Sequence, residues 1–168
     1  MAEMQQGRDK ILLFRRLADS GKEAGKLVFQ TEHTFSYSVP LDRIVTKDGT
    51  IIKVGELEAE VSIEAIQAKQ DPVKDMLATA AKKREKLELW EVTVDEELKN
   101  DDGKYPAVYA QGYLDSWENG AGAEDEATVS SNFIVELEPQ EGFATLTEEQ
   151  ENAVQYAFRD TTAEPAGA

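Results

Sequence analysis

Strict alternation of apolar and polar positions marks residues 55–66, GELEAEVSIEAI. Read as an extended strand, this segment places its carboxylates on one face and its apolar side chains on the other. The carboxylates are those of Glu56, Glu58, Glu60 and Glu64. A helix would also bring three of these glutamates together, but it would scatter the apolar residues around its circumference. The alternation therefore favours a strand that carries a row of like charges.

A second alternating run precedes it, at residues 26–39. One face would carry Leu27, Phe29, His33, Phe35 and Tyr37, and the other Gln30, Glu32 and short hydroxyl side chains. This pattern predicts a long antiparallel strand with one packed face. Between the two runs, residues 40–50 contain Pro40 and the turn-forming pair Asp48-Gly49, which predict a long hairpin loop.

Helical periodicity is clearest in residues 71–84. Asp71 suits the N-cap and Pro72 suits the first helical position. The apolar positions that recur at helical spacing are Val73, Met76, Leu77 and Ala80. We expect this helix to cover a sheet.

Shorter runs predict further strands, at residues 11–16, 86–94, 105–118 and 127–139. In the third of these, Tyr105, Tyr109, Tyr113 and Trp117 recur every four residues and are expected on one strand face. Near the end of the chain, Thr147 and Gln150 match a capping box, which predicts the start of a helix. The whole pattern predicts a mainly β fold with one flanking helix.

Length and composition fit a single domain. The chain has 168 residues, and its hydrophobic residues, 40% of the total, are spread along it without an internal repeat. We expect one domain at residues 1–162 and a disordered tail at residues 163–168.

The charge balance narrows the class of partner. With 18 basic and 34 acidic residues the net charge is −16, which argues against a protein that grips nucleic acid through its phosphates or binds a membrane surface electrostatically. No apolar stretch approaches the length of a membrane span, and the first ten residues lack the apolar core of a signal peptide. The chain has no cysteine, which excludes disulfides and thiol chemistry.

Motifs for catalysis or ligand binding are incomplete. His33 is the single histidine and falls on the expected packed face, where a structural role fits best. A calcium loop near LKNDDG would need acids where the chain has Leu98 and Tyr109. GAGAEDE has neither the spacing of a dinucleotide loop nor the lysine of a P-loop. We therefore expect no catalytic residue, no cofactor and no metal.

Several segments, in order along the chain, resemble the major tail protein of long-tailed, non-contractile phages, mainly those of Gram-positive hosts. They are QGRDKILLF, GKEAGKLVFQTEHTFSYS, TKDG, KLELWEV, YPAVYAQGYLDSWE, AGAEDEATVSSNF and GFATLTEEQENAVQYAFRDT. The resemblance covers roughly residues 3–161. It implies two packed, mostly antiparallel sheets with a flanking helix, and hexameric rings that stack into a hollow tail tube through which DNA leaves the capsid.

The resemblance also implies partners and a location. The partners would be further copies of this chain, the tape-measure protein and the tail initiator and terminator proteins, without a membrane. The location would be the virion tail, assembled in the host cytoplasm. Terminal arms at residues 1–10 and 140–162 and the loop at residues 40–50 would reach neighbouring rings. In the loop, the candidate residues for contact with a neighbouring ring are Asp42, Arg43, Lys47, Asp48 and Gly49.

A conduit for DNA would explain the row of glutamates. Duplex DNA carries about one negative charge per 1.7 Å, so an acidic bore would not retain it. Carboxylates about 7 Å apart in water repel by only roughly 0.6 kcal/mol before screening by salt. The predicted lumen-facing residues are Glu56, Glu58, Glu60, Glu64 and Glu32. Besides the glutamate row, a second candidate row on the preceding strand holds Gln30, Glu32, Thr34, Ser36 and Ser38, and Asn132 with Glu136 form a third. The alternative is a solvated outer face.

The sequence is also compatible with two other functions. An acidic β-sandwich that binds carbohydrate or peptide would have the same composition. A head–tail connector or tail terminator would share the tube fold and stop at one ring.

Overall fold

The computed structural model describes residues 2–147 and Gln150. Its strands are β1 (Lys10–Arg16), β2 (Gly25–Lys26), β3 (Gln30–Ser38), β4 (Leu41–Thr46), β5 (Gly49–Val54), β6 (Glu58–Ile66), β7 (Leu87–Thr93), β8 (Tyr105–Gly120), β9 (Thr128–Val135) and β10 (Gln140–Ala144). The α-helix α1 spans Pro72–Lys83, and short 3-10 turns lie at Gly7–Asp9, Leu17–Asp19 and Glu96–Leu98. The mainly β prediction is confirmed.

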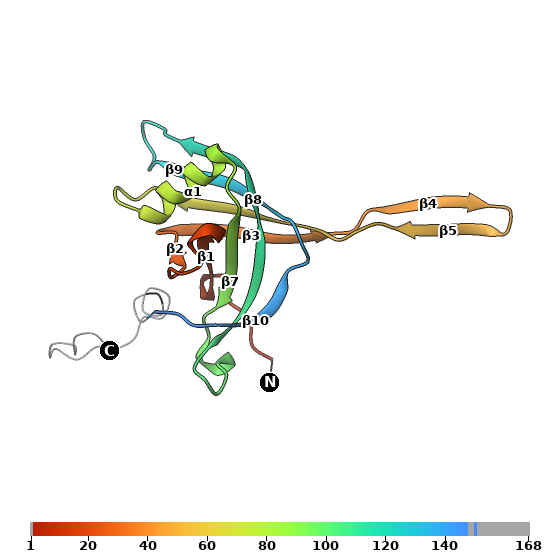
Figure 1. Ribbon diagram of the computed structural model, residues 1–168, viewed down its shortest axis with the longest axis horizontal. Helices are drawn as coiled ribbons and strands as arrows, with labels where there is room; N and C mark the ends of the chain where they lie inside the picture. The colour runs from red at the N-terminus through yellow and green to blue at the C-terminus, as the bar shows by residue number, and fades with distance from the viewer. Residues whose placement is uncertain (1, 148–149, 151–168) are drawn as a thin grey trace.

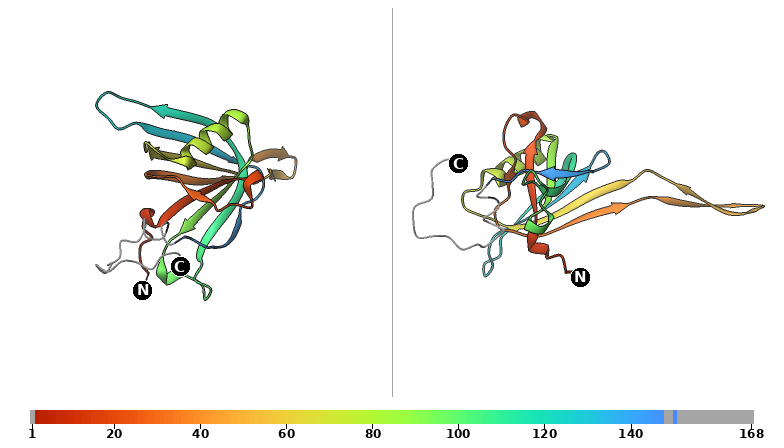
Figure 2. Two further views of the ribbon diagram at one scale, coloured as in Figure 1. Left: turned by 60° about the vertical axis from the view of Figure 1, so that its left-hand side comes forward. Right: turned by 90° about the horizontal axis from the view of Figure 1, so that it is seen from below.

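Two antiparallel sheets make up the β structure. The larger has the order β2-β1-β7-β8-β9-β6-β3, with β10 also paired to β8, and the smaller is the β4–β5 hairpin. The hairpin projects far from the body, whereas the larger sheet is strongly curved (Figures 1 and 2). The long strand β8 joins the two parts of the larger sheet. Its first half pairs with β7 and β10, and its second half pairs with β9.

Gly112 lies where β8 changes partners, since it is the last β8 residue opposite β7 and the first opposite β9. A Cβ at this position would lie 1.9 Å from the carbonyl oxygen of Ile134. Only glycine allows the two backbones to approach so closely. The crossing of β8 from one part of the sheet to the other depends on this residue.

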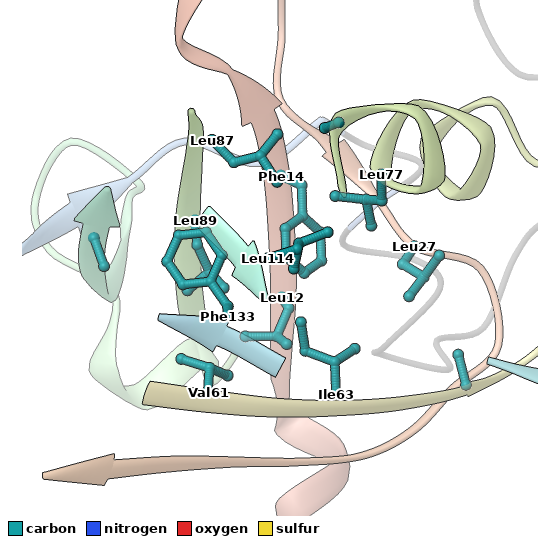
Figure 3. Close-up of a cluster of buried hydrophobic side chains, with 13 residues drawn as sticks. Leu12, Phe14, Leu27, Val61, Ile63, Leu77, Leu87, Leu89, Leu114 and Phe133 are labelled. Carbon is teal, nitrogen blue, oxygen red and sulfur yellow. The ribbon is translucent and has the colours of Figure 1, made fainter. Parts of the chain in front are cut away.

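The main core lies between the two parts of the sheet and beneath α1 (Figure 3). Side chains from β1 and β7, such as Phe14 and Leu89, meet Phe133 of β9 and Val61 of β6. In β6 the odd-numbered residues are buried, namely Ala59, Val61, Ile63 and Ala65, and the residues between them are exposed. The strand interpretation of residues 58–66 is therefore confirmed, and the helical alternative is wrong.

The helix α1 begins as the sequence predicts. Oδ1 of Asp71 accepts hydrogen bonds from the backbone N–H groups of Val73 and Lys74. Its Oδ2 accepts a further one from Val28, so this buried carboxylate also anchors the segment before β3. The helix ends before Arg84, which adopts a left-handed conformation with φ 60°.

The strand predicted at residues 26–39 is shorter, because β3 begins only at Gln30. Phe29 has φ 55°, which interrupts the extended backbone, and its side chain is 61% exposed. The side-chain amide of Gln30 bonds to the backbone N–H and carbonyl of Leu12 in β1. Residues two apart in a regular strand share a face. The register shift between Gln30 and Glu32 breaks this rule, so their side chains lie on different faces.

Residues 40–50 form regular structure instead of the predicted loop. β4 and β5 pair from Leu41 opposite Val54 to Thr46 opposite Gly49, so the turn itself contains only Lys47 and Asp48. The physical reason is the run of β-branched residues on both sides of the turn, which favours extended backbone.

Two further predictions about strands need correction. Trp117 does not share a face with the tyrosines, because a bulge between Leu114 and Ser116 turns it toward the main core. The strand predicted to run to Pro139 ends at Val135, and β10 then forms within the segment predicted as an arm.

The capping box is present, with backbone-to-side-chain hydrogen bonds in both directions between Thr147 and Gln150. The helix predicted to follow it and the tail at residues 163–168 lie outside the described residues.

Candidate functional site

The outward side of β3, β6, β9 and the second half of β8 forms one acidic face. Strand pairing places Glu32 of β3 opposite Glu64 of β6, and Glu64 opposite Ser130 of β9. Ser130 in turn lies opposite Glu118 of β8. We define the acidic face by its exposed carboxylates, which are Glu32, Glu58, Glu60, Glu64, Asp115 and Glu118.

Asn132 orders the centre of the acidic face. Its side-chain Nδ2 lies 3.3 Å from Oε2 of Glu60 and 3.5 Å from Oδ2 of Asp115, so one amide donor lies between two carboxylates from different strands. The remaining outward positions of these strands hold serine, threonine, tyrosine, isoleucine and glycine, and none of the described ones is a lysine or arginine. The face therefore repels anions without internal neutralisation.

The three rows proposed from the sequence meet here only in part. Glu32, Glu58, Glu60, Glu64 and Asn132 lie on the acidic face. Three other candidates do not lie in its pairing register. Glu56 is exposed but precedes β6, Gln30 points toward β1, and Glu136 follows β9 and forms an ion pair with Lys86.

Asp115 and Glu118 belong to the acidic face and were missed by sequence reasoning. Strict alternation along residues 105–118 would have placed Glu118 on one strand face and Tyr113 and Asp115 on the other. The bulge shifts that alternation by one residue, so both carboxylates reach the same face. The sequence has no local signal that marks a bulge at this position.

The β4–β5 hairpin is the second candidate surface, since all its described residues are exposed. Cross-strand pairing divides its side chains into two faces. One face, which we call the apolar hairpin face, holds Leu41, Arg43, Val45, Thr50, Ile52 and Val54. The reverse face pairs Asp42 with Lys53 and Ile44 with Ile51.

The contact residues proposed from the sequence all lie on this hairpin, but they are not its most unusual feature. Asp42 and Arg43 lie near its base, Lys47 and Asp48 form the turn, and Gly49 has φ 132°. The unusual feature is apolar exposure, which reaches 79% at Val45 and 65% at Val54. The sequence signal that could have revealed this exposed apolar surface is the set of paired β-branched residues on both sides of the turn.

Two open strand edges flank the acidic face. β3 ends the sheet order, and β7 pairs with β8 only as far as Gly112, so residues 113–120 pair with β9 alone among the described strands. A groove of about 1560 Å³ runs along β3. Its lining includes Arg8, Lys10, Lys26, Phe29, Phe35 and Tyr37.

His33 connects β3 to β7 at the inner side of this groove. Its Nε2 lies 2.7 Å from Oε2 of Glu91, and both side chains are largely buried. The hydrogen bond to His33 lowers the pKa of Glu91, against a smaller opposite effect of burial. This geometry fits a structural histidine.

No group of three or more His, Asp or Glu side chains within residues 2–147 is arranged to hold a metal ion. The helices in this part of the chain include none of sufficient length and apolarity to cross a membrane.

Comparisons with known proteins identify a family from the sequence and a shared fold from solved structures. A family model described as "Phage tail tube protein" matches residues 4–141. The "Putative tail protein" of Staphylococcus phage phiMR25 is 33% identical over 166 residues, covering 96% of this chain and 86% of its own. The SPP1 tail tube structure has a TM-score of 0.76 at 20% identity, covering 96% of both chains. The tail of a gene transfer agent particle, refined with C6 symmetry, has a TM-score of 0.62 at 13% identity, covering 84% of this chain and 100% of its own.

Proposed function

This chain belongs to the phage tail tube protein family and is a structural, tube-forming protein of the virion; from that premise we propose that it forms hexameric rings. The rings stack into the hollow tail of a long-tailed phage, and genomic DNA passes through the bore. The six-fold symmetry imposed on the gene transfer agent tail supports the ring size. The observation that supports the bore most directly is the continuous acidic face across four strands.

The two open strand edges supply a means of closing the ring. An edge strand presents unpaired backbone N–H and carbonyl groups, which a strand from another chain can satisfy. If β3 of one subunit pairs with residues 113–120 of the next, the contact is head-to-tail and the sheets join into a closed barrel.

The acidic face would then line the bore. In a barrel built from the β3-β6-β9-β8 segment, one side of the sheet faces the lumen and the other packs on the core. The core side is already occupied by Val61, Ile63 and Phe133. The free side has carboxylates in every subunit, and repulsion of DNA phosphates would let the duplex pass without specific binding.

The hairpin would connect successive rings. A two-stranded hairpin alone in water is marginally stable, and the apolar side chains of this one contact solvent. Burial against a neighbouring ring would remove that surface from water and stabilise the hairpin. The family supports further partners, namely the tape-measure, initiator and terminator proteins, and a location in the virion tail after assembly in the host cytoplasm.

Electron microscopy of the purified protein, concentrated and also incubated with tail-initiator complexes, tests the proposal. We expect hollow tubes of stacked rings, and a high-resolution reconstruction should show Glu58, Glu60 and Glu64 at the bore. Single rings under both conditions would indicate a connector or terminator. Persistent monomers would indicate an acidic binding module, and tubes with the acidic face outside would contradict the role of the carboxylates.

A further inference from the structure

Phe29 has an unusual backbone and side-chain environment. Its φ of 55° lies in the left-handed region, which is unfavourable for a bulky residue. Its side chain is 61% exposed, so burial within the subunit does not offset this cost. Val28 and Phe29 form the turn between β2 and β3, and strained residues cluster at functional sites.

The position of Phe29 relates it to the hairpin. Phe29 directly precedes β3, and its carbonyl accepts a hydrogen bond of 3.0 Å from the N–H of Ile66 at the end of β6. The hairpin leaves the opposite ends of the same two strands, after Ser38 and before Glu58. The start of β3 and the hairpin lie at opposite ends of the β3–β6 pair (Figure 1). Phe29, which directly precedes β3, therefore lies at the end away from the hairpin.

An acidic loop lies at the same end as Phe29. Gln67, next to Ile66, binds this loop through its backbone N–H to Ala127 and through its side chain to Asn119 and Thr128. Residues 118–126 contain four acidic side chains and no basic one. Exposed apolar surface, from Phe29 and Val28, therefore lies at the same end of the sheet as a segment of strong negative charge.

The hairpin has the complementary composition. Residues 41–54 contain three basic and two acidic side chains, in a protein whose net charge is −16. Its apolar hairpin face exposes Leu41, Val45, Ile52 and Val54. Opposite ends of one subunit thus both expose apolar side chains, and the hairpin, with one more basic than acidic residue, is opposite in sign to the acidic loop.

We propose that Phe29 and Val28, with the acidic loop 118–126, form the receptor for the β4–β5 hairpin of a second copy of this chain. The apolar hairpin face covers Phe29, and the hairpin's basic side chains meet the acidic loop. Because the two surfaces lie at opposite ends of the β3–β6 pair, the contact is head-to-tail and propagates as an open stack. This inference rests on the proposed function, since it assigns the contact between successive rings.

Substitutions at Phe29 test the receptor. Phe29→Gly and Phe29→Asn both accept φ 55° more readily than phenylalanine does, so the free subunit should keep or raise its urea midpoint. The critical concentration for tube formation, measured by sedimentation with initiator complexes present, should rise at least tenfold. An unchanged critical concentration in both variants would overturn the inference.

The hairpin supplies a matched pair of variants. Ile52→Thr alters the apolar hairpin face, whereas Ile44→Thr makes the same chemical change on the reverse face. Only Ile52→Thr should raise the critical concentration, and combining it with Phe29→Gly should add little, because both remove the same contact. The assignment would be contradicted if Ile52→Thr and Phe29→Gly had fully additive effects on the critical concentration. It would also be contradicted if the two threonine variants raised that concentration equally.

The proposed function and this inference fail in different ways. If the wild-type chain forms no tubes under any condition, the proposed function is wrong and the receptor is wrong with it. If wild-type tubes form and the Phe29 variants assemble normally, only the receptor is wrong.

Discussion

At the scale of single residues, one hydrogen bond links the edge strand β3 to the strand behind it. Glu91 lies 2.7 Å from His33, and this bond lowers the pKa of Glu91. A carboxyl whose pKa is lower in the folded state contributes stability above its unfolded pKa, about 4.3 for glutamate. That contribution disappears as the pH falls through the lower, folded value.

We therefore expect Glu91→Gln to lower the free energy of unfolding by about 1 kcal/mol at pH 7. The difference from wild type should shrink as the pH falls below the unfolded pKa and approach zero as it passes the lowered pKa of folded Glu91, because the wild-type carboxyl then also becomes neutral. Urea denaturation at several pH values measures both effects. Glu58→Gln, the same change at an exposed position, is the control and should alter stability little at any pH.

At the scale of elements, α1 shows how one side chain can serve two segments. Asp71 caps the helix through Oδ1 and binds the backbone of Val28 through Oδ2, and it is only 2% exposed. Its loss would leave N–H groups unpaired at the helix start and in the segment before β3. The helix covers the core through Leu77 and Ala80, so a frayed first turn would also loosen the packing beneath it.

Asp71→Ala should destabilise the protein by about 2 kcal/mol, which combines a lost N-cap with an unsatisfied buried N–H. The midpoint of urea denaturation provides the measurement. Asp75→Ala is the comparison, because Asp75 lies in the first turn and caps nothing among the described residues. An equal loss from both substitutions would show that the cap contributes nothing beyond charge near the helix start.

At the scale of the whole molecule, charge is distributed unevenly. The acidic face has no lysine or arginine among its described residues, whereas the hairpin has more basic than acidic residues. Coulomb repulsion within the acidic face is small in water. The same charges repeated by every subunit around a bore would create a strong negative potential.

Reversing the charge of Glu58, Glu60 and Glu64 to lysine should convert the bore from repelling DNA to retaining it. We expect tubes of this triple variant, assembled with short labelled duplex DNA, to hold DNA that nuclease cannot digest and that salt releases. Wild-type tubes should hold none.

The control for this prediction reverses Glu97, Asp101 and Asp102, which are exposed in a turn outside the acidic face. DNA bound by those tubes should remain open to nuclease. Equal protection in both variants would contradict the assignment of the acidic face to the bore.

The sequence by itself determined those features that depend on neighbours along the chain. Alternation placed Val61 and Ile63 in the core, and Asp71 with Pro72 marked the start of α1. Both follow from the geometry of a single strand or helix, in which spacing alone decides which side chains share a face. The resemblance to tail proteins also depended on residue order alone.

Only the tertiary structure decided which faces lie side by side. Period-two spacing states that Glu60 and Glu64 share a face, but it does not state that β3 and β9 flank β6 or that a bulge brings Asp115 beside Asn132. Strand pairing and bulges are selected by the packing of the whole core, which involves residues distant in sequence. For the same reason the left-handed Phe29 and its place opposite the hairpin could be found only in the folded chain.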